Sequence, residues 1–358
     1  MGPNGSGKSS LFEALHRVRS FVNGDAKVDE LFPGSSLTLW QEAQVQSFDI
    51  EIPYNHSLYR YELRVEHTAD RTQQRVALEK LSFDGRSLMT FEGGKVRLAG
   101  DYDSKVATFP FQANQSVLGS IPRDPDNERL AWFRSAIRRI FVVQILPPLM
   151  SGSTEKGKNS PDRYFRNFVS WYKWISNDQG LALGLQQRLR EVLPDFSHFK
   201  FEALGRDVEI LKVVFGSRSN YITSIAFDEL SDGQRMLISL YALVQSLERV
   251  PDELDSFDDI SPGLLCLDEP DNFISTREIQ PWYAIAEEIL SQTRSRAFII
   301  SHNPESINYS LMPNPGAPAS AFWLDRKDGR HTQIDPITPG ALGGLEPSEL
   351  VARGWLKA

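Results

Sequence analysis

The stretch Gly2-Pro3-Asn4-Gly5-Ser6-Gly7-Lys8-Ser9 decides the fold. Its glycines free backbone N–H groups to wrap a chain of phosphates, and the apolar pattern of residues 11 to 22 predicts the helix whose N-terminus completes such a loop. Lys8 would reach the β- and γ-phosphates, and the Ser9 hydroxyl would coordinate Mg²⁺. A glycine-rich turn capped by serine is the plain alternative. The residues expected to contact a nucleotide from this loop are Asn4, Gly5, Ser6, Gly7, Lys8, Ser9 and Ser10.

A second motif, Leu264-Leu265-Cys266-Leu267-Asp268-Glu269-Pro270, is an apolar strand that ends in two carboxylates. This is the arrangement that holds Mg²⁺ and polarises a water molecule beside a bound nucleotide. Asp268 is the expected metal-side acid, and Glu269 is the expected general base. Two acids at a strand end are often no more than a solvated turn, so this pair depends on the other motifs for its interpretation.

A third motif, Leu230-Ser231-Asp232-Gly233-Gln234, resembles the LSGGQ signature of ABC-type ATPases, with Asp232 where that family more often has Gly. The resemblance implies that Ser231, Gly233 and Gln234 contact the γ-phosphate of an ATP held by a second protomer. The residues themselves predict a helix from Gln234 onward that Ser231 or Asp232 caps, with a dipole that suits an anion. A simple helix cap is the alternative.

A fourth motif, Phe298-Ile299-Ile300-Ser301-His302, is a strand that ends in Ser-His and resembles the switch histidine of the same family. One histidine at a strand end is more often structural. However, the glycine-rich loop of residues 2–9 (the P-loop), the signature, the strand with two carboxylates at 264–270 (the Walker B motif) and the switch motif follow one another in the order that the family has. The catalytic residues implied are therefore Glu269, His302 and Lys8, and the metal ligands are Ser9 and Asp268.

The long interval between Ser9 and Ser231 separates the chain from transporter subunits and resembles RecF-like and OLD-like ATPases and stand-alone ABC-type proteins labelled AAA ATPases. Residues 168–193, 228–243, 268–279 and 346–356 are most similar to those stand-alone proteins. The resemblance implies an α/β P-loop NTPase of the ABC type, with a mixed central sheet, an antiparallel β meander and an inserted helical lobe.

The same resemblance implies a biochemical function. Two protomers would sandwich ATP and Mg²⁺ and hydrolyse the ATP in DNA repair, genome maintenance or phage defence. The alternative is a nucleotide-gated scaffold or sensor with little turnover that regulates a separately encoded nuclease or toxin. A homodimer, DNA and such an effector protein are the partners expected.

Two features depart from that family. The family places two strands before the P-loop, so we expect a central slot of the sheet to be empty: either the true start lies upstream, or the chain is a fragment, or another segment substitutes. The glutamine of the Q-loop is also uncertain: Gln144, between an apolar strand and Pro147-Pro148, is favoured over Gln112 and Gln115.

Apolar and turn patterns predict the remaining elements. Strands are expected at 39–52, 58–67, 76–83, 95–98, 199–201, 208–215, 264–267 and 297–300, with turns at Asp84-Gly85 and Gly93-Gly94 and a hairpin around Asp328-Gly329. Helices are expected at 127–139, 162–193, 232–250 and 276–291. We expect one composite ATPase domain in three parts, 1–110, 111–228 and 229–358.

Composition limits the partners. The net charge of −8 restricts nucleic-acid contact to a local surface. Residues 123 to 175 carry ten Lys or Arg against five acids, with interleaved aromatics, and form either such a surface or a helix core with a solvated face. The acidic stretch 251–259 is predicted to be a solvated linker. Cys266, the one cysteine, is expected in a buried strand, and the chain in the cytoplasm without a membrane span.

Overall fold

The computed structural model describes residues 1–38, 42–101, 106–216, 222–249, 262–311, 320–326, 331–337 and 345–353. The chain forms two compact units, one of Met1–Phe12 with Phe141–Ala358 and one of Glu13–Ile140. All four motifs belong to the first unit. The division expected at residues 110 and 228 remains a prediction, and the acidic stretch 251–259 lies outside the described residues.

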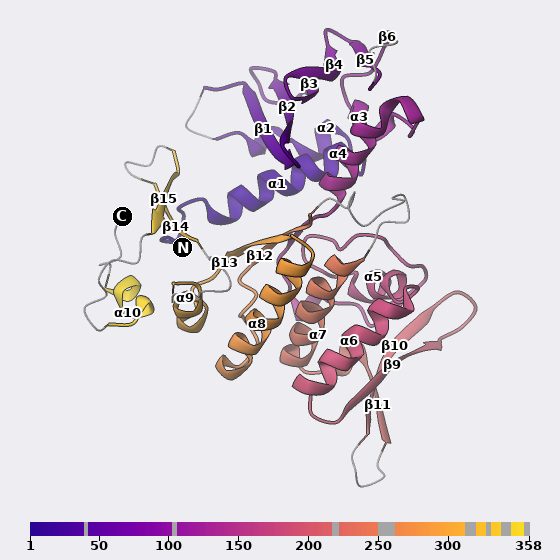
Figure 1. The fold of residues 1–358 in the computed structure, drawn as a ribbon, viewed down its shortest axis with the longest axis vertical. Coiled ribbons are helices and arrows are strands. Elements are labelled where there is room, and N and C mark those ends of the chain that lie inside the picture. Colours follow the sequence, from indigo (N-terminus) through magenta and orange to yellow (C-terminus); the bar gives the residue numbers. More distant parts are fainter. Residues whose placement is uncertain are drawn as a thin grey trace. The chain divides into compact units, whose positions relative to one another are not determined.

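The Glu13–Ile140 unit is built on a six-stranded antiparallel sheet whose strands follow one another in chain order. Its strands are β1 (Val45–Tyr54), β2 (Ser57–His67), β3 (Gln74–Phe83), β4 (Arg86–Glu92), β5 (Lys95–Ala99) and β6 (Val106–Pro110). Side chains along β2 alternate between buried and more exposed, as expected for a sheet with one packed face. The predicted meander is confirmed (Figure 1).

Two tight turns set the register of this meander. Asp84 and Gly85 join β3 to β4, and Gly93 and Gly94 join β4 to β5, all four with positive φ. Two consecutive residues with positive φ match the right-handed twist of a hairpin. The first strand begins at Val45, and its predicted start at residue 39 lies outside the described residues; at the other side of the pair, β2 ends at His67, whose N–H donates to Gln44 O.

The helices of this unit are α1 (Lys8–Asn23, shared with the first unit), α2 (Val28–Leu31), α3 (Val117–Ser120) and α4 (Glu128–Arg138). Helix α4 lays its aromatic face on the sheet, where Trp132 stacks on Tyr59 with ring centroids 4.9 Å apart. Phe133 packs in the same way on Tyr61. Trp132 is therefore part of the core rather than of a nucleic-acid surface.

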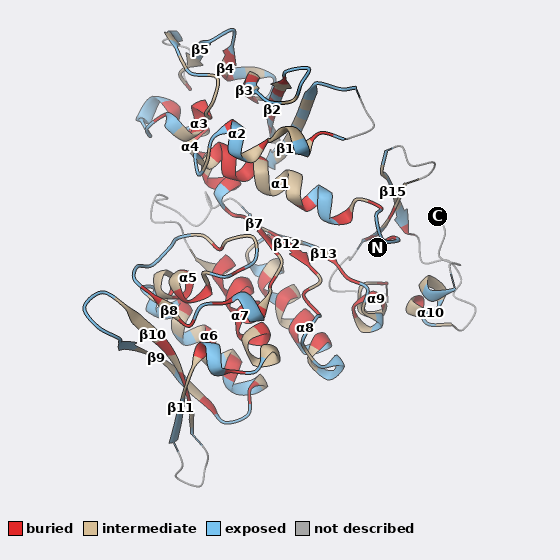
Figure 2. Cartoon of the chain, turned by 180° about the vertical axis from the view of Figure 1, so that it is seen from behind, coloured by how far each residue is buried: buried red, intermediate tan, exposed pale blue. Residues whose placement is uncertain are grey.

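The first unit contains a three-stranded sheet in the order β13-β12-β7, formed by β7 (Ile140–Val143), β12 (Leu264–Asp268) and β13 (Arg296–Ile300). β12 and β13 run parallel, as the predicted strand-helix-strand unit requires. Helices α6 (Gln179–Val192), α7 (Asp232–Gln245) and α8 (Thr276–Gln292) lie side by side (Figure 1). Helix α7 is buried along most of its length (Figure 2), and its side chains share one core with Leu265 and Leu267 of β12.

Cys266 occupies the middle of β12 and is fully buried, as expected. Burial raises the pKa of its thiol to about 12, so the thiol stays protonated at neutral pH. This cysteine fills space in the core. It is not a nucleophile.

A second, antiparallel sheet in this unit contains β8 (Ser153–Thr154), β9 (Phe196–Ala203), β10 (Glu209–Gly216) and β11 (Ile222–Ala226), with β10 between β9 and β11. The continuous helix expected over 162–193 is wrong. Asp162 Oδ1 accepts hydrogen bonds from the N–H groups of Tyr164 and Arg166 and holds a turn, and Phe165 adopts a positive φ of 56°. The helical part begins only with α5 (Phe168–Ile175), and Asp178 caps α6 after a short break.

The end of the described chain contains α9 (Pro304–Leu311), the antiparallel pair β14 (Ala321–Asp325) and β15 (Gln333–Ile337), and α10 (Pro347–Ala352). The hairpin is confirmed, although its turn at Asp328-Gly329 lies outside the described residues. Met1 bonds the backbone of β14: its amino group donates to Phe322 O (2.8 Å), and its carbonyl accepts from Leu324 N (2.9 Å). Among the described strands, β13 has only β12 as a hydrogen-bonded neighbour. The expected mixed α/β architecture is confirmed, and no described helix is both long and apolar enough to cross a bilayer.

Candidate functional site

The P-loop depends on glycine at two positions of positive φ, Gly5 (80°) and Gly7 (96°). A Cβ atom on Gly7 would stand 2.5 Å from Thr332 Oγ1, so a side chain there meets both backbone strain and a steric clash. Helix α1 begins directly after, at Lys8, and Leu11 N bonds Gly7 O. The loop therefore leads into a helix N-terminus, the geometry that favours phosphate.

The Lys8 side chain folds back over this loop. Its Nζ donates to the carbonyl oxygens of Gly2 (2.7 Å) and Pro3 (3.0 Å), and the residue is buried. Burial lowers the pKa of Lys8, whereas the nearby carboxylates of Glu269 and Asp268 act in the opposite direction. The P-loop lysine and the two Walker B acids, some 260 positions apart in sequence, thus lie within electrostatic reach of each other.

Asp268 ends β12 with its carboxylate 4% exposed. Arg163 Nη2 donates to Asp268 Oδ2 at 3.3 Å and forms an ion pair with it. Sequence reasoning missed Arg163 as a site residue, because no motif surrounds it and it lies 105 positions from its partner. An arginine in a basic region carries no signal that distinguishes it from its neighbours.

Glu269 follows with a positive φ of 51°, a strained conformation for a side chain other than glycine that costs roughly 1 kcal/mol or more. Two hydrogen bonds hold it: Glu269 N donates to Ile300 O (2.8 Å), and Asn272 Nδ2 donates to Glu269 Oε2 (2.8 Å). The end of the neighbouring strand β13 thus anchors the backbone of Glu269, and Asn272 holds its carboxylate. Strain at a residue proposed as a base is consistent with a functional position.

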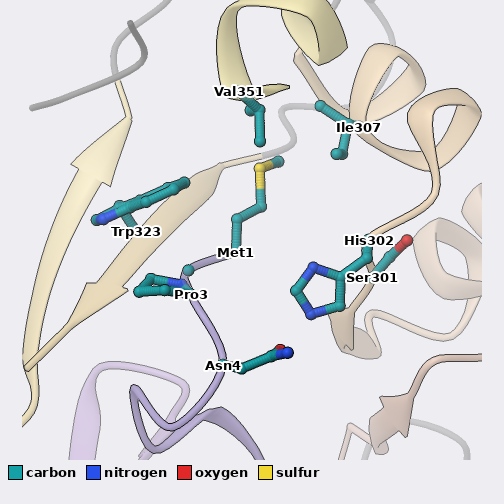
Figure 3. Close-up of a pocket in the computed structure, with 9 residues that line it drawn as sticks. Met1, Pro3, Asn4, Ser301, His302, Ile307, Trp323 and Val351 are labelled. Carbon is teal, nitrogen blue, oxygen red and sulfur yellow. The ribbon is translucent and has the colours of Figure 1, made fainter. Parts of the chain in front are cut away.

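The switch segment begins at the end of β13. His302 is exposed and lines a cavity of about 310 Å³ together with Asn4 of the P-loop (Figure 3). Its neighbour Ser301 is buried and donates to Asp271 Oδ2, which also accepts from Ser306 Oγ at 2.6 Å. Asp271 therefore ties the segment carrying His302 to the loop after Walker B, and it too was missed from sequence, since it lies one residue past the quoted motif.

The signature segment starts helix α7 as predicted. Ser231 Oγ accepts from Gln234 N (3.3 Å), and Gln234 Oε1 accepts from Ser231 N (3.1 Å), which forms a reciprocal cap. A Cβ atom on Gly233 would lie 2.9 Å from Phe273 O, so glycine allows the loop after Walker B to approach. Ser231 is exposed and lies at a helix N-terminus, where an anion from outside the chain could be received.

Gln144 follows β7, which is the hydrogen-bonded neighbour of β12 in the sheet. Its N–H donates to Arg163 O at 2.8 Å, so it is linked to the residue that pairs with Asp268. Gln112 and Gln115 belong to the Glu13–Ile140 unit instead. This placement favours Gln144 as the Q-loop glutamine, and the assignment stays a prediction.

The residues present fit a magnesium ion of the kind that P-loop proteins hold. No cluster of three or more His, Cys, Asp or Glu forms within the described ranges, so an all-protein cage is absent there. Mg²⁺ in nucleotide sites, however, takes only one or two protein ligands, with phosphates and water as the rest. Asp268 is a buried carboxylate with a cation already beside it, and Ser9 supplies an exposed hydroxyl.

Most of the aromatics between residues 123 and 175 are core. Trp171 and Tyr172 are buried, as Trp132 is, and Arg249 lies over the ring of Trp174 at 3.6 Å. Tyr164 is the exposed exception, with Arg166 over its ring. The solvated-face interpretation fits this region better than a stacking surface for single-stranded nucleic acid.

The model of a family described as "AAA domain, putative AbiEii toxin, Type IV TA system" matches residues 1–308. No curated protein matches the chain. Among solved structures, an SMC head domain from Thermotoga maritima is similar over 94% of this chain and 88% of that one, with 13% identity and a TM-score of 0.36.

Proposed function

The chain belongs to the family described as "AAA domain, putative AbiEii toxin, Type IV TA system", and from this premise we propose that it binds ATP and hydrolyses it to ADP and phosphate. The membership agrees with the resemblance to stand-alone ABC-type proteins labelled AAA ATPases. One observation carries the proposal: Lys8 of the P-loop lies within the electrostatic field of both Asp268 and Glu269.

The proposed roles follow from the geometry. Asn4 to Ser10 receive the phosphates on backbone N–H groups, and Lys8 exchanges its two carbonyl partners for phosphate oxygens. Ser9 and Asp268 hold Mg²⁺, which supplies Lewis-acid stabilisation of phosphate charge when bound. Gln144 and His302 border the same site from the ends of β7 and β13.

Glu269 acts as the base. Its carboxylate, oriented by Asn272 and by the anchored backbone, accepts the proton of the attacking water. His302 donates a hydrogen bond toward charge that develops on the γ-phosphate. The strained backbone at Glu269 fixes the direction in which the carboxylate points before substrate arrives.

Dimerisation completes the site. Ser231 is exposed at the start of α7, and Gly233 and Gln234, which follow it, are half-buried. We propose that this helix start meets the nucleotide of a second copy. Binding of ATP would close the pair, and hydrolysis would open it. Each of the two ATP sites is then composite, that is, formed by residues of both protomers.

For the biological role we favour defence over genome maintenance, and we keep regulation of a toxin as the second candidate. The description of the family, which names a putative toxin and a toxin–antitoxin system, supports this choice. An ATPase that works by hydrolysis, in maintenance or in defence, and a nucleotide-gated regulator of a toxin differ in turnover. Steady-state hydrolysis measured with and without double-stranded DNA distinguishes them: stimulation by DNA supports a maintenance ATPase, and negligible turnover with ATP-dependent assembly supports a scaffold or sensor.

The composite site predicts that two inactive variants complement each other. Ser231→Ala removes the hydroxyl offered to the partner's nucleotide, and Glu269→Gln removes the base, so each alone should hydrolyse ATP poorly. In a mixture, half of the dimers pair one of each and contain one intact site, which restores up to about a quarter of wild-type turnover. Phosphate release from equimolar mixtures measures this.

Asp178→Ala is the matched control, because Asp178 is likewise an exposed N-cap, with its side chain bonded to the N–H groups of Gly180 and Leu181. Loss of a cap costs about 1 kcal/mol of stability in either variant. Only Ser231→Ala should lose turnover. If the mixture is no more active than its components, the two-protomer site is refuted.

A further inference from the structure

The ion pair between Arg163 and Asp268 is buried. The Arg163 side chain is 11% exposed and the Asp268 side chain 4%, with 3.3 Å between Nη2 and Oδ2. The guanidinium also lies close enough to β12 to act on the pKa of the Cys266 thiol. Neither charge has much access to water, so each gains from the other's compensation.

The same carboxylate is the one to which the proposed function assigns Mg²⁺. A guanidinium in contact with Oδ2 and a divalent cation bonded to that carboxylate repel each other in a medium of low dielectric constant. Two cations therefore compete for one buried carboxylate.

The backbone at Arg163 is fixed, so any exchange involves the side chain. Its carbonyl oxygen accepts from Gln144 N (2.8 Å), and the next carbonyl, that of Tyr164, accepts from Leu146 N. Asp162 holds the turn from the other side. Rotation of one long side chain moves the charge, whereas the path of the main chain stays as it is.

We propose that Arg163 is the resident counter-cation of Asp268 and that Mg²⁺ displaces its guanidinium when nucleotide binds. Arg163 thereby sets the concentration of Mg²⁺ that nucleotide binding requires. This inference rests on the proposed function, because Asp268 must be the metal-side acid.

The first test needs no nucleotide. Arg163→Ala leaves Asp268 buried without its cation, so the melting temperature of the full chain should fall by roughly 5 °C or more. Millimolar MgCl₂ alone should then restore at least about half of that loss, because the metal takes the vacated place. NaCl at equal ionic strength should not restore it.

Three further chains serve as controls in the same melting experiment. Wild type and Arg166→Ala, which removes an exposed arginine of the same segment, should respond to MgCl₂ by less than about 1 °C. The double variant Arg163→Ala/Asp268→Asn should not be rescued. A shift of equal size in all chains, or none in Arg163→Ala, overturns the inference.

A second measurement covers the case in which Arg163→Ala does not fold. Arg163→Lys keeps a cation beside Asp268 but loses the planar fork of the guanidinium, so it should hold the carboxylate less tightly. The MgCl₂ concentration for half-maximal binding of ATP should fall severalfold from wild type to Arg163→Lys. An unchanged or higher requirement refutes competition. Absence of ATP turnover in the wild type refutes only the proposed function, since the melting experiment contains no nucleotide.

Discussion

Glu269→Gln is expected to bind ATP as tightly as the wild type and to lose about 10²- to 10⁴-fold in turnover. Glutamine keeps the size of the side chain and can still accept the hydrogen bond from Asn272, but it cannot take a proton from water. Because ATP then stays intact between protomers, the variant should accumulate as a dimer with ATP. Phosphate release and light scattering after gel filtration measure the two effects.

Glu288→Gln is the matched control, because Glu288 is a half-exposed acid on α8 outside the motifs. It should hydrolyse ATP at the wild-type rate. Turnover by Glu269→Gln equal to that of this control would show that Glu269 is not the base. A variant that neither binds ATP nor dimerises would place Glu269 in binding instead.

Lys8→Ala is expected to weaken ATP binding by roughly a hundredfold or more, since charge-assisted hydrogen bonds to phosphate are worth up to about 3 kcal/mol. Unlike Glu269→Gln, it should form no dimer with ATP. Calorimetric titration with ATP and Mg²⁺ measures the loss. Lys95→Ala, at an exposed lysine of the β4–β5 hairpin, should bind as the wild type does.

The pH dependence of binding has a defined sign. Burial lowers the pKa of Lys8 below its ordinary 10.5, so its charge is lost as pH rises through a value lower than that of an exposed lysine. ATP affinity should therefore begin to fall on the alkaline side before exposed lysines titrate. Affinity that is constant up to the ordinary lysine pKa, or Lys8→Ala that binds normally, contradicts the assigned role.

Local patterns were sufficient for much of the fold. The two-residue turns Asp84-Gly85 and Gly93-Gly94 specify hairpins because both residues of each turn adopt a positive φ. Both turns lie at the positions predicted from the sequence. The capping pair of Ser231 and Gln234 is equally local. Such features involve residues within a few positions of each other, so their energetics can be inferred directly from the chain.

Long-range contacts were not predictable in this way. The apolar spacing of residues 162 to 167 resembles a helix, but the side chain of Asp162 competes for the N–H groups that the helix would use. The contact between Arg163 and Asp268 joins residues 105 positions apart, and that of Asp271 with Ser301 joins residues 30 apart. Neither pairing can be predicted from residue spacing or composition, because the packing of whole helices and strands brings those side chains together.

The burial of Cys266 determines how the unaltered protein reacts with thiol-labelling reagents. Cys266 is fully buried in β12, so thiol reagents do not reach its sulfur while the strand is folded. Burial also raises the pKa of the thiol to about 12, so little of the reactive thiolate is present at neutral pH. A fluorophore or spin label attached through a cysteine introduced on an exposed helix would therefore report from one place. Conversely, the rate at which a thiol reagent slowly labels Cys266 in the unaltered protein would measure the rate at which β12, the strand that carries Asp268, opens.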